Sequence, residues 1–201
     1  MTPPTALNII ESKSKDLVPQ LGGKPLHSLH NPIREAEVLA SNHLAHLSRS
    51  PSVLILGLGF GYHIDEIIKI LHLKHKTASV AVLEPRADLI RLWESYRQKP
   101  IGVNVFTAKD IPEIYANQVF CEFLLQKPVV IIHPQSFESA PEFYRSFMSR
   151  RASSELGEWQ LGDKWWDDWA QANAGSPWDH LTHSAPQAAW LNAFWELKHA
   201  E

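Results

Sequence analysis

The sequence predicts an α/β protein with a mostly parallel sheet, and three observations carry this prediction. Four short apolar runs have the length of buried strands: 52–56, 78–83, 102–106 and 129–132. Amphipathic segments of helical periodicity separate these runs. Three glycines at alternate positions follow the first run directly. Strands that alternate with helices form right-handed βαβ units, so the expected architecture is a Rossmann-like three-layer fold.

Composition excludes several classes of protein. The 201 residues carry a net charge of −3, which gives no general attraction to nucleic acid or to acidic membranes. No apolar run approaches the roughly 18 residues of a membrane span, and the first residues do not resemble a signal peptide. The single Cys121 excludes an internal disulfide and suits a reducing compartment. We therefore expect a cytoplasmic protein without nucleic-acid binding or membrane insertion.

Three segments are expected along the chain. Residues 1–24 look loose and end in Gly22-Gly23. Residues 25–152 hold the Rossmann-like domain. Residues 153–201 form a helical appendage rich in tryptophan, since seven of the eight tryptophans lie between Trp159 and Trp195.

The domain is expected to begin with a helix. Asn31 suits an N-cap and Pro32 the first helical position, and an apolar face continues to Leu47. The helix is expected to end near 48–51. A helix before the first strand commonly covers one end of a ligand pocket, which makes His27 and Ser28 ligand-adjacent candidates.

The run 52–56 is the first strand, and the glycine turn 57–61 leads into a helix over 62–73. Glycines let a ligand approach bare backbone, and a helix N-terminus offers unpaired N–H groups. Gly57, Gly59, Gly61 and the adjoining Tyr62 are therefore cofactor-binding candidates, with His63 beside them. The alternative interpretation is a tight strand-to-helix turn that binds nothing.

The spacing of the turn separates two cofactor classes. A dinucleotide fingerprint requires a glycine where Tyr62 stands. The pattern Gly-x-Gly-x-Gly is closer to the loop of S-adenosylmethionine (SAM) dependent methyltransferases, although these usually carry an acid where this chain has Ile55. The identity of the cofactor stays open, with SAM and a nucleotide as the two alternatives.

The second strand, 78–83, ends at Glu84, and Pro85 separates it from a helix over 87–97. An acid at the end of the second strand is the residue that binds ribose hydroxyls in nucleotide folds. Glu84 is therefore the fifth cofactor-binding candidate. The alternative is a solvated acid that pairs with Arg86.

The remaining elements complete the sheet. A third strand at 102–106 is followed by a helix that Asp110 opens, a fourth strand at 129–132 and a helix over 139–151. The loop 133–136 follows the fourth strand on the ligand edge of the sheet. His133 in this loop is a weak candidate for an acid–base group, because imidazole titrates near neutral pH.

The appendage is expected to hold two helices with aromatic stripes. Large apolar side chains recur four residues apart: Trp165 and Trp169, Trp190 and Phe194, Leu191 and Trp195. Burying one aromatic ring removes roughly 150–250 Å² from water, so these stripes should pack on the body or on a second subunit. We expect a homodimer.

Four histidines at i, i+3 spacing invite a metal hypothesis: His27, His30, His43 and His46. No cysteine, acidic motif or His-Glu-x-x-His pattern completes the set. Surface or locally hydrogen-bonded histidines are the better interpretation, and no metal is expected.

Three stretches together carry a family resemblance. They are the segment 26–37 with its His-Ser and Asn-Pro pairs, the Gly-x-Gly-x-Gly-Tyr-His pattern at 57–63, and Val-Leu-Glu-Pro at 82–85. The combination resembles the N-terminal domain of motility accessory factors (Maf flagellin glycosyltransferases), a family grouped with 6-hydroxymethylpterin diphosphokinase MptE-like proteins. Asn31 stands where this family usually has Asp.

The resemblance covers about residues 25–150. It implies a Rossmann-like nucleotide-type fold and a link to protein glycosylation or motility. The family's transferase centre lies in a following domain with a Gly-Pro-Ser-Leu-type motif, which this sequence lacks. No catalytic residue therefore carries over.

Three functions follow as hypotheses. The first is a nucleoside-ligand-binding or assembly module of the motility accessory factor type. The second is a small SAM-dependent methyltransferase, in which Gly57, Gly59, Gly61 and Glu84 hold SAM. The third is a non-catalytic protein whose Trp-rich helices mediate dimerisation. Whether the chain is an enzyme stays open at this point, and a transferase is the class expected if it is.

Overall fold

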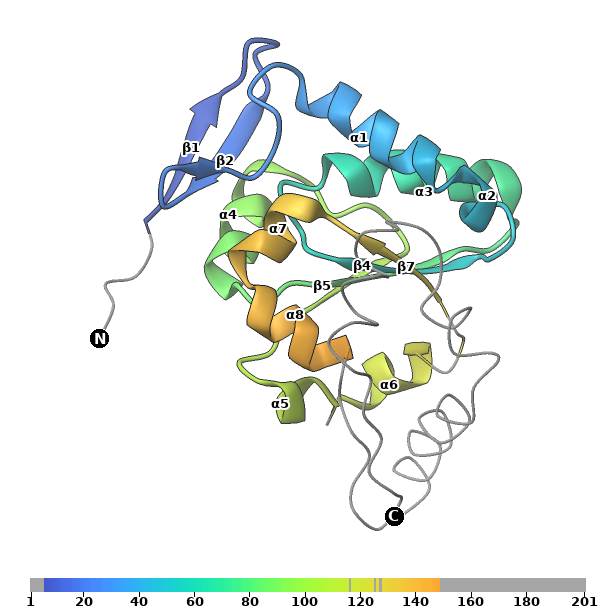
Figure 1. Ribbon diagram of the computed structural model, residues 1–201. Helices are drawn as coiled ribbons and strands as arrows, with labels where there is room; N and C mark the ends of the chain where they lie inside the picture. Colours follow the sequence, from blue (N-terminus) through green and yellow to red (C-terminus); the bar gives the residue numbers. More distant parts are fainter. Residues whose placement is uncertain (1–5, 116, 125, 127, 149–201) are drawn as a thin grey trace.

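A computed structural model describes residues 6–115, 117–124, 126 and 128–148. The Trp-rich appendage predicted for 153–201 lies outside these residues, so its helices and the expected homodimer stay predictions. The chain forms an α/β structure around a parallel four-stranded sheet (Figure 1). In the described part of the chain, no helix is long and apolar enough to cross a membrane.

The central sheet has the order β6-β5-β4-β7. Its strands are β4 (Ser52–Leu56), β5 (Ser79–Leu83), β6 (Val103–Phe106) and β7 (Val129–Ile132). All neighbouring pairs are parallel, with Leu54 opposite both Ala81 and Val130. The strand order reverses at β4, since β5 and β6 extend to one side and β7 lies on the other. This is the Rossmann-like arrangement that the alternation of strands and helices predicts.

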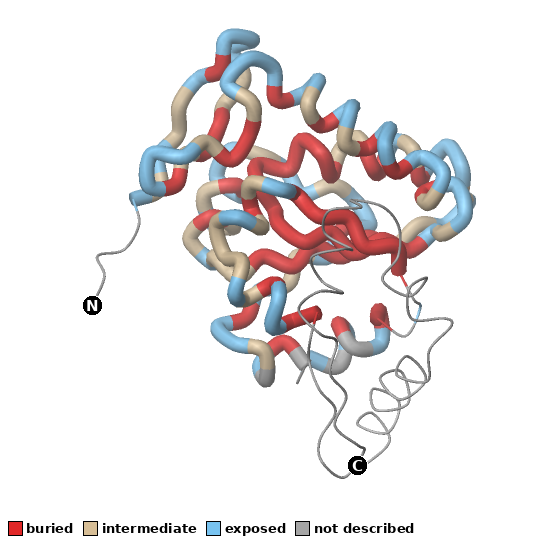
Figure 2. The backbone as a smooth tube through the Cα atoms, in the orientation of Figure 1, coloured by how far each residue is buried: buried red, intermediate tan, exposed pale blue. Residues whose placement is uncertain are grey.

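Helices cover both faces of the sheet. α1 (Pro32–Asn42), α2 (Leu44–Leu47), α3 (Tyr62–Lys74) and α4 (Ala87–Tyr96) belong to one layer. α5 (Ile111–Tyr115), α6 (Gln118–Leu124), α7 (Pro134–Ser139) and α8 (Pro141–Met148) belong to the other side. Alternate residues of β4 enter the two cores, Val53 and Ile55 on the first face and Leu54 and Leu56 on the second. Figure 2 shows the resulting buried sheet between more exposed helices.

Residues 7–25 are ordered, which differs from the loose segment expected over 1–24. They form an antiparallel sheet of β1 (Leu7–Glu11), β2 (Leu17–Leu21) and β3 (Lys24–Pro25). Gly22 and Gly23 make the turn between β2 and β3, with φ of 55° and 84°. A two-residue Gly-Gly turn is typical of a hairpin, so this pair connects two strands rather than ending a loose segment. Val18 in β2 is fully buried.

The predicted start of the first helix is confirmed. The Asn31 side chain accepts a hydrogen bond from the Arg34 N–H at 2.8 Å, and Pro32 is the first residue of α1. The helix does not run unbroken to 48–51, because the chain leaves helical geometry at His43 and α2 follows. The helix expected after Asp110 is likewise divided into α5 and α6.

A second helix start was not predicted. His133 is the N-cap of α7, where its Nδ1 accepts from the Ser136 N–H at 3.3 Å and Pro134 takes the first helical position. The segment 133–136 is therefore the start of a helix rather than the expected loop. The sequence signal is the His-Pro pair, which repeats the capping logic of Asn31-Pro32.

Candidate functional site

The site lies where the strand order reverses. The turn 57–61 leaves the carboxyl end of β4, and His133 leaves the carboxyl end of the adjacent β7. In open parallel sheets, ligands bind in the crevice outside the strand ends at this reversal point. The first candidate location in the molecule is therefore the space between the glycine turn and the start of α7.

The N–H groups of the glycine turn donate to side chains of the chain itself. The Leu58 N–H donates to Glu84 Oε2 at 3.0 Å, and the Gly59 N–H donates to Ser136 Oγ at 3.1 Å. The Phe60 N–H donates to His27 Nε2 at 2.8 Å. All three acceptors come from segments far from the turn in sequence. A ligand that binds these N–H groups has to replace the side chains.

The turn requires glycines because side chains from other segments lie close to its backbone. Gly59 has φ of 52°, and a Cβ atom there would lie 2.5 Å from His27 Nε2 and 2.8 Å from His133 Cε1. A Cβ on Gly57 would collide with Ser136, and one on Gly61 would lie 2.7 Å from the Trp93 ring nitrogen. The expectation was bare backbone beneath a ligand. The described structure instead places histidine, serine and tryptophan side chains against it.

Glu84 is buried, not solvated, and it does not pair with the Arg86 side chain. Its Oε2 accepts from the Leu58 N–H and its Oε1 accepts from the Arg86 N–H at 3.0 Å. The Arg86 guanidinium binds Asp88 instead. Burial raises the pKa of Glu84 to about 7, although the two backbone hydrogen bonds act in the opposite direction. The Glu84 carboxylate therefore stabilises the glycine turn through the Leu58 N–H.

His27 joins the N-terminal part of the chain to the turn. Since its Nε2 accepts from the Phe60 N–H, its Nδ1 carries the proton, which points to Glu35 Oε2 at 3.2 Å. The same Glu35 oxygen accepts from the Ser28 N–H at 2.9 Å. The candidate His27 therefore lies beside the glycine turn.

His63 and His133 stack face to face beside His27. Their ring centroids are 4.3 Å apart and the ring planes differ by 8°. His63 Nε2 lies 3.1 Å from the Gly57 carbonyl, so this nitrogen donates and Nδ1 holds a lone pair. Among the described residues, neither His63 Nδ1 nor His133 Nε2 has a hydrogen-bond partner, although both atoms are buried.

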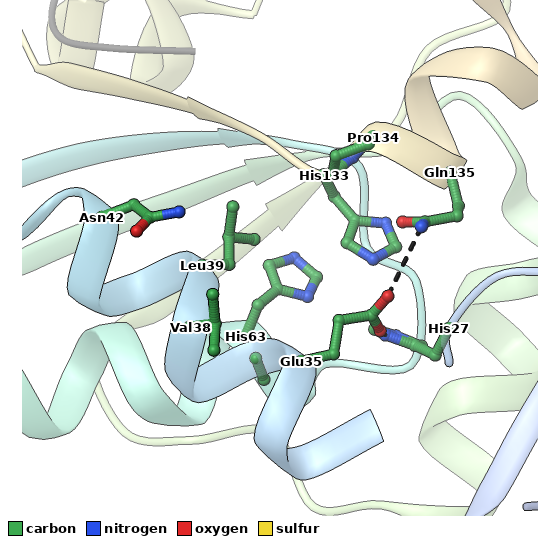
Figure 3. A pocket seen from close by; sticks show the side chains of 10 residues that line it. His27, Glu35, Val38, Leu39, Asn42, His63, His133, Pro134 and Gln135 are labelled. Carbon is green, nitrogen blue, oxygen red and sulfur yellow. Dashed lines mark hydrogen bonds and ion pairs between the residues drawn. The ribbon is translucent and has the colours of Figure 1, made fainter. Parts of the chain in front are cut away.

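A cavity of about 180 Å³ adjoins these rings. We call it the histidine pocket, and its walls come from α1 and from the starts of α3 and α7 (Figure 3). The Gln135 side-chain amide donates to Glu35 Oε1 at 3.4 Å. The side-chain amide of Asn42 also lines the pocket. The exposed Val38 side chain also lines it, so the pocket reaches the surface along α1.

The three histidines are neutral at pH 7. Burial lowers the pKa of His63 to about 3 and holds the pKa of His133 well below its usual value. Burial also lowers the pKa of His27, in spite of the hydrogen bond to Glu35. Neutral imidazoles keep one lone pair each, so the pocket can accept hydrogen bonds or ligate a cation.

Two predicted site residues serve other contacts. The Ser28 hydroxyl accepts from the N–H groups of His30 and Asn31 and so supports the start of α1. The Tyr62 hydroxyl donates to the Leu17 carbonyl at 2.9 Å, and its ring lies 4.4 Å from the Arg97 guanidinium carbon. Tyr62 therefore ties the N-terminal sheet to α3.

No pattern in the sequence marks Glu35, Gln135 or Ser136 as a site residue. Glu35 lies three residues after Pro32 on a predicted helix. This position does not indicate that its side chain lines a pocket. The histidines His43 and His46 were expected at the surface or in local hydrogen bonds. His43 is buried, and neither of its ring nitrogens has a partner among the described residues.

Comparisons with known proteins show a general likeness. No protein-family model and no curated protein matches the sequence. MNMC2 from Aquifex aeolicus matches at 15% identity and a TM-score of 0.41, over 64% of this chain and 60% of that one. Spermidine synthase from Thermotoga maritima matches at 15% identity and a TM-score of 0.46, over 71% and 61%.

A spermidine synthase in complex with the transition-state analogue AdoDATO matches at 14% identity and a TM-score of 0.46, again over 71% and 61%. The chain spans about three fifths of the length of each of these proteins. The Rossmann-like assignment rests on the strand order of this chain. The resemblance to motility accessory factors stays a prediction.

Proposed function

We propose that this chain is a Rossmann-like small-molecule-binding module whose ligand enters the histidine pocket. The observation that carries the proposal is the pair His63 Nδ1 and His133 Nε2, buried and unpartnered among the described residues. A buried polar atom without a partner costs about 1–3 kcal/mol. A ligand that satisfies both atoms removes this cost, which favours binding there.

The two nitrogens define what the ligand must offer. His63 Nδ1 accepts a hydrogen bond, because its other nitrogen donates to Gly57. His133 Nε2 donates, because its Nδ1 accepts from the Ser136 N–H. A hydroxyl or amide group, which both donates and accepts, matches this pair.

The volume limits the size of the part that enters. About 180 Å³ is less than the roughly 300–1,000 Å³ of pockets for drug-sized ligands. The pocket therefore suits one ring of a larger molecule, such as the sugar or base of a nucleoside. A nucleoside-containing ligand is also what the resemblance to motility accessory factors implies, and protein glycosylation is the first biological context to examine.

A SAM-dependent methyltransferase is the second candidate. It is favoured by the position of Glu84 at the end of β5, beside the turn that follows β4, and by His133 at the end of β7. In this candidate the ribose hydroxyls take over the hydrogen bonds that the Leu58 and Arg86 N–H groups now give to Glu84. His133 then serves as the acid–base group.

Calorimetry tests the proposal. The full chain is titrated in a chelator-containing buffer with SAM, S-adenosylhomocysteine and nucleoside mono- and diphosphates. Val38→Trp fills the pocket from its exposed wall, and Glu37→Trp places the same ring on the neighbouring exposed position of α1, which does not line the pocket.

At least one compound is expected to bind wild type and Glu37→Trp equally, and Val38→Trp about tenfold or more weakly, a difference of about 1.4 kcal/mol. No binding by any compound, or equal binding by both variants, contradicts the proposal. Binding that Val38→Trp leaves intact but Glu84→Ala abolishes favours the methyltransferase candidate.

A further inference from the structure

His27, His63 and His133 come from three separate elements and meet at one point. One ring nitrogen of each lies within 4.8 Å of one ring nitrogen of each of the others. All three side chains are buried, with ring centroids 4.6 Å apart for His27 and His133 and 5.8 Å apart for His27 and His63. No local sequence motif predicts this cluster, because the three histidines lie in three separate segments of the chain.

In each of the three rings, one nitrogen has a hydrogen-bond partner outside the cluster. The other nitrogen of each ring faces the other two histidines. His27 Nδ1 meets the Glu35 carboxylate at 3.2 Å, and His63 Nε2 meets the Gly57 carbonyl at 3.1 Å. His133 Nδ1 meets Ser136 Oγ at 2.8 Å. Metal-ligating histidines almost always donate their second N–H to a carboxylate, a carbonyl or a similar oxygen, which orients the ring and fixes the tautomer.

The hydrogen bonds indicate which nitrogen of each ring holds the lone pair. A neutral imidazole has one such lone pair, which can bind a cation. His63 already presents its lone pair on the unpartnered Nδ1. His133 presents one on Nε2 when its proton moves to Nδ1, where Ser136 Oγ accepts it.

His27 is the third nitrogen. Its Nε2 lone pair is held by the Phe60 N–H at 2.8 Å, so a cation has to displace this hydrogen bond. The stacked rings of His63 and His133 have to tilt toward each other for both lone pairs to converge. These changes involve side chains, the Phe60 N–H of the glycine turn and the Ser136 N–H, which loses His133 Nδ1 as its acceptor.

We propose that His27, His63 and His133 form a three-histidine site for a first-row transition metal ion of the zinc class, with Glu35 as the positioning residue of His27. The proposal names the cofactor of the histidine pocket and in that sense rests on the proposed function. In the metal-bound form His63 Nδ1 and His133 Nε2 ligate the metal, so an organic ligand hydrogen-bonds to these nitrogens only in the metal-free chain. Imidazole ligands select Zn²⁺, Cu²⁺ or Ni²⁺ over Mg²⁺ and Ca²⁺, which prefer oxygen.

A metal with three protein ligands keeps a further coordination position. The three histidines line the histidine pocket together with Gln135 and Asn42, so a ligand in the pocket would lie beside the metal. A hydroxyl or carbonyl oxygen of a ligand in the pocket would complete the coordination. The metal would act there as a Lewis acid that polarises this oxygen.

The test uses Zn²⁺ alone, without any organic ligand. The full chain is stripped with chelator, dialysed and titrated with ZnCl₂ in a calorimeter, with MgCl₂ as the comparison. His63→Asn and His133→Asn each remove one proposed ligand. His43→Asn is the matched control, because His43 is also buried and belongs to no such cluster among the described residues. Circular dichroism checks that each variant folds.

One Zn²⁺ per chain is expected for wild type and for His43→Asn, with affinity at least about tenfold lower in each ligand variant. If the ligand variants do not fold, ¹⁵N spectra of the histidine rings of wild type decide the matter. Zn²⁺ should then shift the nitrogens of His27, His63 and His133 and leave those of His43 unchanged.

The proposal is overturned if wild type binds no Zn²⁺, if Zn²⁺ binds both ligand variants as tightly as wild type, or if the ring nitrogens of the cluster do not shift. The titration of organic compounds in chelator is a separate measurement. If the protein binds no Zn²⁺, the result of that titration does not change. If the pocket binds no organic ligand, that titration shows no binding, whatever the result with Zn²⁺.

Discussion

The buried Phe60 N–H donates to His27 Nε2 at 2.8 Å, and this hydrogen bond joins the start of the domain to the glycine turn. Glu35 fixes the acceptor tautomer of His27 from the other side of the ring. His27 therefore supports the conformation of the turn, together with Glu84 and Ser136, and also lines the histidine pocket.

Replacing this imidazole should destabilise the protein. His27→Ala leaves the Phe60 N–H buried without its acceptor and opens a cavity, and we expect a loss of roughly 2–4 kcal/mol in the free energy of unfolding. His30→Ala is the matched control, because His30 comes from the same segment and is exposed. Urea unfolding of both variants measures the difference. Equal stability of the two would show that the His27 hydrogen bond is unimportant.

Gly59 should tolerate no side chain, for a reason internal to the protein. In Gly59→Ala the new Cβ lies 2.5 Å from His27 Nε2, whereas a Cβ on Gly23 meets nothing within 4 Å. Both glycines have positive φ, so Gly23→Ala carries the conformational cost of about 1 kcal/mol alone. Gly59→Ala should lower the melting temperature much further than Gly23→Ala.

This result bears on how loss of ligand binding is interpreted. A bulky residue at Gly59 disturbs His27 and His133 whether or not a ligand touches the backbone. Loss of binding in Gly59→Val alone therefore does not show backbone approach by a ligand. If Gly59→Ala is as stable as Gly23→Ala, the packing of the two histidines against the turn is incorrect.

His43 should make the stability depend on pH. Burial lowers its pKa from 6.5 to about 4, and the nearby His46 acts in the same direction. The unfolded chain therefore binds a proton at this residue between pH 6.5 and 4 that the folded chain does not. The contribution of His43 is intact above pH 6.5 and is lost as the pH falls toward 4.

His43→Leu removes this dependence and also removes two buried nitrogens that lack partners among the described residues. The variant should be more stable than wild type, and its advantage should be larger at pH 5 than at pH 8 by roughly 2 kcal/mol. Urea unfolding at the two pH values provides the comparison. An advantage that does not change with pH would mean that His43 protonates equally in both states.

Tyr62 should control the order of the N-terminal sheet. Its hydroxyl donates to the Leu17 carbonyl, so Tyr62→Phe removes a contact between α3 and β2 worth about 0.5–1.5 kcal/mol. Amide exchange in β2 should accelerate, while exchange in β4 and β5 should not change. Tyr96→Phe is the control, because this ring is 57% exposed. An unchanged rate of amide exchange in β2 would show that the Tyr62 hydroxyl does not stabilise this sheet.

The sheet was predictable because its signals are local. The mostly apolar run at 52–56 and the all-apolar run at 129–132 indicate buried strands, and Asn31-Pro32 indicates a helix start. The N-terminal sheet was missed because Gly22-Gly23 serves equally in a hairpin and in a loop. The division of the first helix at His43 was missed because the apolar periodicity continues across it.

The site was predictable only in part, for a physical reason. The glycine turn indicates the edge of the sheet at which the candidate site lies, and the sequence offers His27, His63 and His133 as candidates. Their meeting at one point depends on the reversal of strand order between β4 and β7, which no local pattern encodes. The same reversal brings Ser136 and Glu84 onto the N–H groups of the turn, so groups expected to be open to a ligand are satisfied internally.

The central claim is that the ligand binds between α1 and the start of α7. The most direct measurement is a crystal structure of the full chain, stripped of metal with chelator, with the compound that calorimetry selects from the SAM and nucleoside phosphate series. We expect density in the histidine pocket, with a ligand group within hydrogen-bond distance of His63 Nδ1 and His133 Nε2. Density over Glu84 or beside Arg97, with the histidine pocket empty, would contradict the claim.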